Sequence, residues 1–221
     1  MSIILKNVTY SYRSKYQTVQ AVNDVSYDFE PGKLYAIIGS SGSGKTTLLS
    51  LMAGLDLPTG GDILVDGKST KRWNRNALRR ERISVIYQNY NLFPLLTVRE
   101  NICYPLKLKH MGGRKARELA KQMRTRVGLA EAYDNRLPRQ LSGGEQQRVA
   151  IARTLAQGCK IILADEPTGN LDSVNTDNIV EILRSLAHED GCTVIIVTHD
   201  PSVAERADVI LRMKDGCMIN E

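Results

Sequence analysis

The sequence predicts an α/β fold with a mainly parallel sheet, an N-terminal antiparallel β-patch and an inserted helical subdomain. Three observations lead to this prediction: apolar strand-like runs alternate with helix-like runs, a glycine-rich loop joins one such strand to a helix, and a helix-rich span interrupts the alternation. The chain has 221 residues, enough for one large domain with a substantial core.

Four continuous apolar runs predict buried parallel strands, at residues 34–38, 83–87, 160–164 and 193–198. Such runs are typical of strands that helices cover on both faces. Residues 3–12, 19–29 and 61–65 instead carry turn signals and alternating polarity. They predict an antiparallel β-patch beside the main sheet.

The span from about residue 89 to residue 140 breaks the strand–helix alternation. Prolines and paired glycines separate its helix-rich segments, and residues 114–127 consist of good helix formers. We therefore expect a single domain over residues 1–221 that contains a helical subdomain at approximately 89–157.

Composition indicates a cytoplasmic protein. Apolar residues make up 42% of the chain, and no run approaches the roughly 20 apolar residues that span a bilayer. The first six residues are too short and too soon charged for a secretory signal.

The four cysteines form no C-x-x-C pair, which favours reduced thiols. A net charge of +6 suits nucleic acid, an anionic membrane face or nucleotide phosphates, and it does not choose among them.

Residues 39–46, GSSGSGKT, match the phosphate-loop pattern G-x-x-x-x-G-K-[ST]. The loop follows the strand at 34–38 and precedes a helix at 47–53 that Gly54 ends, which is the context that the pattern requires. Backbone N–H groups and the helix N-terminus can then cradle phosphates. The sequence thus predicts a P-loop NTPase core that binds ATP through Gly39, Ser40, Ser41, Gly42, Ser43, Gly44, Lys45, Thr46 and Thr47.

Four side chains around this loop predict the chemistry of ATP hydrolysis. Lys45 supplies a positive charge for the β- and γ-phosphates, and the Thr46 hydroxyl is a ligand for Mg²⁺. Asp165 ends the apolar run at 161–164, where it can hold Mg²⁺ through water. Glu166 follows near the γ-phosphate and is suited to polarising the attacking water.

Residues 141–146, LSGGEQ, make the prediction specific. Ser142 and Glu145 form a capping-box pattern that opens a helix at 146–157. Gly143 and Gly144 leave backbone N–H groups unshielded at that helix N-terminus, which makes a second anion site. A phosphate-loop protein with this motif resembles the ABC ATPase family, and the resemblance covers residues 5 to 216.

The resemblance implies further site residues. Tyr12 is expected to stack on adenine, although Tyr10 and Tyr16 are near enough to leave that choice open. Gln88 ends the strand at 83–87, where the family places a glutamine that senses Mg²⁺ and the transporter. His199 ends the strand at 193–198, at the position of a histidine that contacts the γ-phosphate.

The family resemblance also implies an assembly. Ser142, Gly143, Gly144 and the D-loop residue Asp172 complete the ATP site of a second protomer, so that a homodimer sandwiches two ATP molecules. The motif at residues 165–173, DEPTGNLDS, is similar to that of the LolD, MacB, FtsE and BceA group. This implies an exporter or mechanotransmission system, with an integral-membrane permease as partner at the inner face of the cell membrane.

Two other functions remain as alternatives. One is a non-transport ABC ATPase that acts on nucleic acid or ribosomes; we expect no nucleic-acid partner, because the long insertions or second ATPase half of such proteins are missing. The other is a regulatory module that binds ATP without hydrolysing it, and the presence of Glu166 and His199 argues against it.

Two segments are candidate membrane-side surfaces. Residues 89–97, NYNLFPLLT, follow Gln88 and mix aromatic and apolar side chains, which suits either packing of the helical subdomain or the wall of a groove that grips a permease helix. Residues 109–126 are strongly basic, which suits either a solvated helix face or weak attraction to an anionic leaflet.

Overall fold

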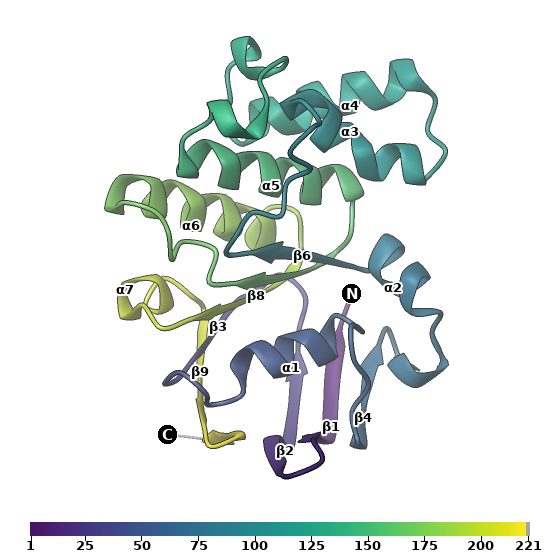
Figure 1. The fold of residues 1–221 in the computed structure, drawn as a ribbon, viewed down its shortest axis with the longest axis vertical. Helices are drawn as coiled ribbons and strands as arrows, with labels where there is room; N and C mark the ends of the chain where they lie inside the picture. Colours follow the sequence, from purple (N-terminus) through teal and green to yellow (C-terminus); the bar gives the residue numbers. More distant parts are fainter. Residues whose placement is uncertain (220–221) are drawn as a thin grey trace.

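A six-stranded, mainly parallel sheet forms the centre of the protein (Figure 1). The computed structural model describes residues 1–219. Strand order is β10-β9-β3-β8-β7-β6. Neighbours pair in parallel except in the β9–β10 hairpin. The bounds are β3 Leu34–Ile38, β6 Ile83–Tyr87, β7 Ile161–Asp165, β8 Thr193–Thr198, β9 Val209–Lys214 and β10 Cys217–Ile219. The predicted α/β class is confirmed.

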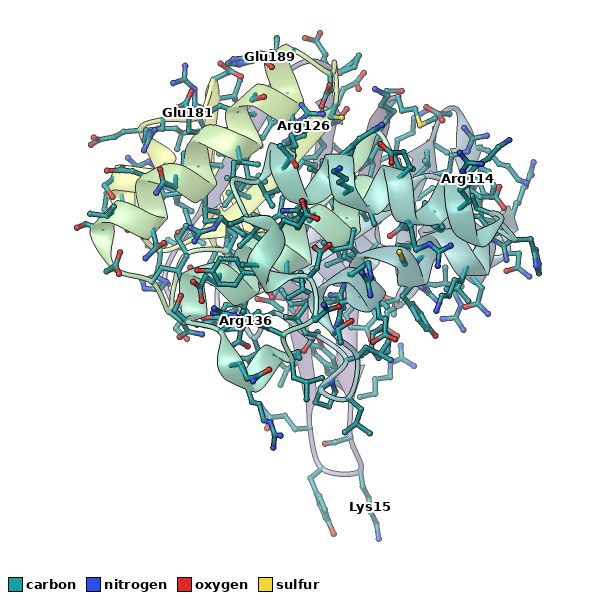
Figure 2. All side chains as sticks on the ribbon, turned by 90° about the horizontal axis from the view of Figure 1, so that it is seen from above. Lys15, Arg114, Arg126, Arg136, Glu181 and Glu189 are labelled. Atoms are coloured by element: carbon teal, nitrogen blue, oxygen red, sulfur yellow. The ribbon has the colours of Figure 1, made fainter. Side chains whose placement is uncertain are left out.

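The N-terminal residues form a separate antiparallel sheet, as the alternating pattern predicts. Its order is β2-β1-β4-β5, with β1 at Ile3–Arg13, β2 at Thr18–Phe29, β4 at Gly60–Val65 and β5 at Lys68–Ser69. The pairing of β1 with β2 shifts register several times between Leu5 and Ser11. These bulges bend the strand, so the β1–β2 hairpin projects from the body, with Lys15 at its tip (Figure 2).

The central sheet separates two hydrophobic cores. Val194 and Ile196 of β8 face one core, and Ile195 and Val197 face the other. Helix α1 (Lys45–Met52) and the antiparallel sheet cover one face. Helices α5 (Gly143–Gln157) and α6 (Ser173–His188) cover the opposite face. Burial on both sides explains why the strand sequences are continuously apolar.

A helical layer lies between β6 and β7 in the sequence and at the top of Figure 1. It contains α3 (Val98–Leu108), α4 (Gly113–Arg126) and α5, which pack on one another. Capping boxes begin α3 at Thr97 and α5 at Ser142, so α5 starts three residues earlier than the sequence pattern predicts. The division into one domain with a subdomain at about 89–157 stays a prediction.

Short elements complete the described chain. They are the helices α2 (Arg75–Glu81) and α7 (Pro201–Ala204) and the 3-10 turns Thr70–Arg72, Glu131–Tyr133 and Pro138–Gln140. Within residues 1–219 no helix is both long and apolar enough to cross a bilayer. The four cysteines are free thiols, three of them buried.

The basic run at 109–126 is less uniform than a solvated helix face requires. Figure 2 shows Arg114 and Arg126 at opposite ends of α4. Arg124 is only 4% exposed and lies 3.0 Å from Asp134, and Arg126 lies 2.5 Å from Asp190. These two arginines therefore stabilise packing, whereas Arg114 and the other basic side chains in the first three turns of α4 stay exposed.

Candidate nucleotide-binding site

The predicted site residues follow neighbouring strands at one edge of the central sheet. Ile38, the last residue of β3, pairs with Thr198 of β8, and Asp165 of β7 pairs with Val197 of β8. Parallel pairing therefore brings the phosphate loop, Glu166 and His199 to the same carboxyl edge. Ligands of open α/β sheets commonly bind at this edge.

The phosphate loop depends on two glycines that no other residue can replace without strain. A Cβ on Gly39 would collide with the carbonyl oxygen of Met213, and one on Gly44 with that of Ala21. Gly44 also has φ 99° at the N-cap of α1. The loop thus packs backbone to backbone against β2 and β9, which fixes its N–H groups in place.

Lys45 points into the loop rather than into solvent. Its side chain is buried, and its Nζ donates hydrogen bonds of 2.8 Å to the carbonyl oxygens of Gly39 and Ser40. No carboxylate among the described residues forms an ion pair with it. A buried ammonium group without a carboxylate partner is costly, and an anion placed in the loop would offset that cost.

Thr46 and Asp165 form a second cluster of oxygen ligands. The Thr46 Oγ1 lies 3.2 Å from Asp165 Oδ1. Burial raises the pKa of Asp165 above its usual range, and the neighbouring Glu166 carboxylate raises it further, while Thr46 and Lys45 oppose the shift. Hydroxyl and carboxylate oxygens are ligands that Mg²⁺ prefers, so the pair fits this ion.

Glu166 and His199 are in direct contact. His199 Nδ1 lies 2.7 Å from Glu166 Oε1, and the Glu166 side chain is 16% exposed against 69% for His199. Glu166 has φ 46°, a left-handed conformation that is unfavourable for a residue with a Cβ. The hydrogen bond from Glu166 N to Val197 O (2.9 Å) helps to hold this turn. The carboxylate is therefore positioned by both backbone and imidazole.

A cavity of about 670 Å³ is lined by the phosphate loop, Lys45, Thr46, Glu166 and His199, whereas Asp165 does not line it. Tyr12 lies on its wall, with its hydroxyl 3.1 Å from Thr47 Oγ1. Tyr10 packs edge-on against Tyr12, and Tyr16 is 89% exposed in the hairpin turn, so neither lines the cavity. The wall also includes three residues of β2 that the sequence did not single out: Val19, Gln20 and Ala21.

Gln88 is close to this edge but does not line the cavity. A Cβ on Gly169 would lie 3.0 Å from its Nε2, so the amide packs against the turn after Glu166. Asn170 Nδ2 donates to the Gln88 carbonyl oxygen at 3.3 Å. The proposed contact of Gln88 with a metal stays a prediction.

The residues of the signature motif, LSGGEQ at 141–146, lie apart from the cavity. Ser142 caps α5: its Oγ accepts from Glu145 N at 3.3 Å, and Glu145 Oε2 accepts from Ser142 N at 2.7 Å. A Cβ on Gly144 would collide with Asn175, which Asp172 binds through its carboxylate. The predicted nucleotide ligands thus divide into two groups within one chain.

Comparison with known proteins identifies this arrangement. The sequence profile of the ABC transporter family matches residues 22–169. The chain belongs to the ABC transporter family, as an ATP-binding protein with ATP hydrolase activity.

Relatives support the transporter function over the nucleic-acid alternative. The chain is 42% identical over 219 residues to an uncharacterized ABC transporter ATP-binding protein of Mycobacterium tuberculosis, covering 97% of this chain and 88% of the relative. It is 43% identical over 225 residues to the macrolide export ATP-binding/permease protein MacB of Neisseria gonorrhoeae, covering all of this chain but 35% of MacB.

Solved structures share the whole fold. A dimeric structure of MJ0796, described as a bacterial ABC transporter cassette, aligns with a TM-score of 0.92 at 42% identity and covers 99% of this chain and 97% of the other. A relative of that name in Methanocaldococcus jannaschii is 43% identical over 220 residues. A second dimeric structure of MJ0796, in a post-hydrolysis state with ADP and Pi, has the same TM-score, 0.92.

Proposed function

We propose that the chain binds MgATP in the cavity beside α1 and hydrolyses it as one half of a homodimer that drives a membrane permease. One observation carries the proposal: the same cavity is lined by Lys45, Thr46, Glu166 and His199. These are a cation, a hydroxyl, a carboxylate and an imidazole, the groups that phosphate binding and water activation require.

The phosphate loop binds the nucleotide through its backbone and one side chain. The N–H groups of residues 39–47, in the loop before α1 and in its first turn, would face the phosphates. Lys45 Nζ exchanges its bonds with loop carbonyls for contacts with the β- and γ-phosphates. The exposed ring of Tyr12, on the wall of the cavity, stacks on the adenine base.

Thr46 and Asp165 would hold Mg²⁺, with Gln88 as a further ligand. The described residues contain no cluster of three or more His, Cys, Asp or Glu side chains that could hold a metal. Mg²⁺ usually binds through one or two carboxylates together with substrate phosphates, so the ion would bind with the nucleotide. When bound, it supplies positive charge that neutralises the phosphate oxygens.

Glu166 accepts a proton from the attacking water, and His199 positions it. The 2.7 Å contact between His199 Nδ1 and Glu166 Oε1 fixes the carboxylate while leaving the exposed imidazole near the cavity. A positioned general base contributes about 10²–10⁴-fold to the rate.

Dimerisation supplies the second group of ligands. Ser142, Gly143, Gly144 and Asp172 do not line the cavity of their own chain, so they are free to serve the cavity of a partner. The N–H groups at the start of α5 would then face the partner's γ-phosphate in a head-to-tail homodimer. The dimeric MJ0796 cassettes support this assembly.

The remaining partner is an integral-membrane permease, which places the chain at the inner face of the cell membrane. The proposed system is an exporter or a mechanotransmission system, and the similarity to MacB, whose name joins export, ATP-binding and permease functions, supports export. A groove beside residues 89–97 is the proposed docking site. It is lined by Phe93, Tyr104, Leu108 and Arg153 together with residues of α2 and β6.

The test has two measurements. ATP turnover by the purified chain should require Mg²⁺ and fall to background with a chelator. The tagged chain, purified from detergent-solubilised membranes of its own cells, should carry a membrane protein with it. Turnover that persists without divalent cations would contradict the proposed site, and recovery of nucleic acid or ribosomes instead would contradict the transport function.

A further inference from the structure

The groove between α2, β6, α3 and α5 combines an apolar floor with a strongly positive wall. It encloses about 450 Å³. Ile83 and Val85 of β6 form part of its floor, and Phe93, Tyr104 and Leu108 contribute apolar and aromatic surface. Of the described residues that line it, three are charged, and all three are arginines: Arg79, Arg80 and Arg153.

Two of these guanidinium groups have only neutral acceptors. Arg79 donates to the carbonyl oxygen of Gly54 at 2.7 Å and to Asn76 Oδ1 at 2.7 Å. Arg153 donates to the carbonyl oxygens of Asn91 at 2.7 Å and Tyr90 at 3.0 Å. Neither has a carboxylate partner among the described ion pairs. Their charge is thus uncompensated beside a partly desolvated surface.

Arg80 and the neighbouring sequence add further positive charge around the groove. Arg80 pairs with Glu81 at 3.0 Å, yet residues 68–82 contain seven lysines and arginines against this single acid. Lys107 and Lys109 flank Leu108 at the other rim and are exposed. A charge distribution of one sign around a cleft attracts a ligand of the opposite sign and orients it before contact.

We propose that this groove binds an acidic segment of the membrane partner, which places an aspartate or glutamate carboxylate against Arg79 and Arg153. The inference rests on the proposed function, because it assumes a permease partner, and it adds the chemistry of the docking segment. Arginine binds carboxylates through two parallel N–H···O bonds. The aromatic floor takes the apolar face of the same segment and excludes water from the ion pair.

Arg153 connects this contact to the nucleotide edge. Its guanidinium group donates hydrogen bonds to the carbonyl oxygens of Tyr90 and Asn91. These two residues follow Gln88 almost directly and have left-handed φ angles of 59° and 46°. Gly143 lies against the other end of Tyr90: a Cβ there would be 2.8 Å from the tyrosine hydroxyl. A carboxylate that draws the Arg153 guanidinium away weakens its hold on this strained turn, beside both the Gln88 loop and the signature loop.

The first experiment measures association with charge variants. The tagged full-length chain is purified from detergent-solubilised membranes of its own cells, and the membrane protein is quantified per mole of tagged chain. Arg79→Glu should reduce recovery at least tenfold, and Arg79→Lys should keep it within about threefold. Raising the salt from about 50 to 500 mM should weaken association, since screening weakens ion pairs.

Arg72→Glu is the matched control. It makes the same charge change on the same basic segment, at an exposed residue that does not line the groove, and should leave recovery unchanged. A folded Arg79→Glu chain, judged by its thermal melt, that recovers as much membrane protein as the unmodified chain would overturn the proposal. If the unmodified chain recovers no membrane protein, the proposed function fails instead, so the two failures are distinct.

The second experiment identifies the partner group directly. Arg79→Lys supplies a primary amine, which a carbodiimide joins to a contacting carboxylate with loss of water. Mass spectrometry should then find a crosslink to an aspartate or glutamate in a cytoplasmic segment of the permease. A photo-crosslinker at Leu108, inside the same groove, should label the same segment. Labelling of a segment that contains no acidic residue would refute the acidic-segment assignment.

Discussion

Two helix N-termini are predicted to bind phosphate, the α1 end and the α5 end, and they differ in the catalytic side chains that surround them. At α1, the segments that follow β3, β7 and β8 bring Lys45, Glu166 and His199 to one cavity. At α5, Ser142 and Glu145 bond to one another in a capping box, and the described residues place no pair like Glu166 and His199 beside it. The α1 end therefore has the groups for chemistry, whereas the α5 end offers only N–H donors. A division of this kind makes sense if each α5 end serves the α1 end of another chain.

The largest expected effect comes from removing the base at the α1 end. Glu166→Gln keeps the shape of the side chain and a contact for His199, but an amide does not accept a proton as a carboxylate does. Turnover should fall by about 10²–10⁴-fold, or roughly 3–5 kcal/mol of barrier. ATP binding should persist because Lys45 and Thr46 are unchanged. Steady-state ATPase assays and nucleotide-binding titrations measure the two effects separately.

The same variant tests whether the two ends meet. With hydrolysis blocked, Glu166→Gln should elute as a dimer with MgATP and as a monomer without nucleotide in size-exclusion chromatography. Near-normal turnover would remove Glu166 from the role of base. A chain that binds ATP but stays monomeric would show that the homodimer needs the permease to hold it.

Removing the positive charge of Lys45 should have the next largest effect, a loss of ATP affinity. Lys45→Ala deletes a charge-assisted contact to phosphate worth about 1.5–3 kcal/mol, so ATP affinity should fall roughly 10- to 150-fold. The fold should survive, because Lys45 Nζ bonds only within its own loop in the described structure. Isothermal titration measures the affinity and a thermal melt the fold. Unchanged ATP affinity in the folded variant would contradict the site.

A change at the N-terminus of α5 should weaken dimerisation but leave nucleotide binding intact. Ser142→Arg, added to Glu166→Gln, places bulk and charge where the partner's nucleotide would sit. The ATP-dependent dimer should weaken at least tenfold, about 1.4 kcal/mol, while ATP affinity of the monomer stays the same. A trapped dimer that still forms would contradict the head-to-tail arrangement.

Much of the central sheet was predictable because its strands are buried on both faces. The runs at 34–38, 83–87 and 193–198 coincide with β3, β6 and β8. The helices α2 and α6 and the β9–β10 hairpin were not predicted. The turn Asp215-Gly216 is a hairpin signal that would have found the last of these. The polar helix α2 contains five charged or amide residues among seven, so periodicity alone does not reveal it.

The site was predictable as a set of motifs but not as a geometry. The choice between Tyr10 and Tyr12 depends on bulges in β1, because each bulge changes the face that following side chains occupy, whereas Tyr16 lies in the hairpin turn beyond β1. The contact between Glu166 and His199 joins two residues that are 33 apart in sequence. It depends on the register of β7 against β8. Local sequence patterns carry no information about such a register.

The smallest expected effect concerns Asp165, the proposed metal-binding carboxylate, and the stability that its burial costs the fold. Since burial raises the pKa of Asp165, the ionised carboxylate destabilises the fold in the absence of Mg²⁺ and nucleotide. Asp165→Asn should therefore raise the melting temperature of the metal-free chain at pH 8. For a chain of this size, about 1 kcal/mol corresponds to roughly 2–4 °C. Added MgATP should raise the melting temperature of this variant by less than that of the unmodified chain.

The pH dependence gives this prediction its sign. The folded pKa of Asp165 lies above the unfolded value of about 3.9, so between the two the folded chain binds the extra proton. The destabilisation is thus fully present above the raised pKa and is relieved as the pH falls through it. The difference in melting temperature between Asp165→Asn and the unmodified chain should be largest at pH 8 and shrink toward acid. Because both chains share every other titrating group, a difference that instead grows toward acid would show that Asp165 is stabilised as a carboxylate. The α1 end would then be assembled at no cost to stability, and the contrast with the α5 end would lie in chemistry alone.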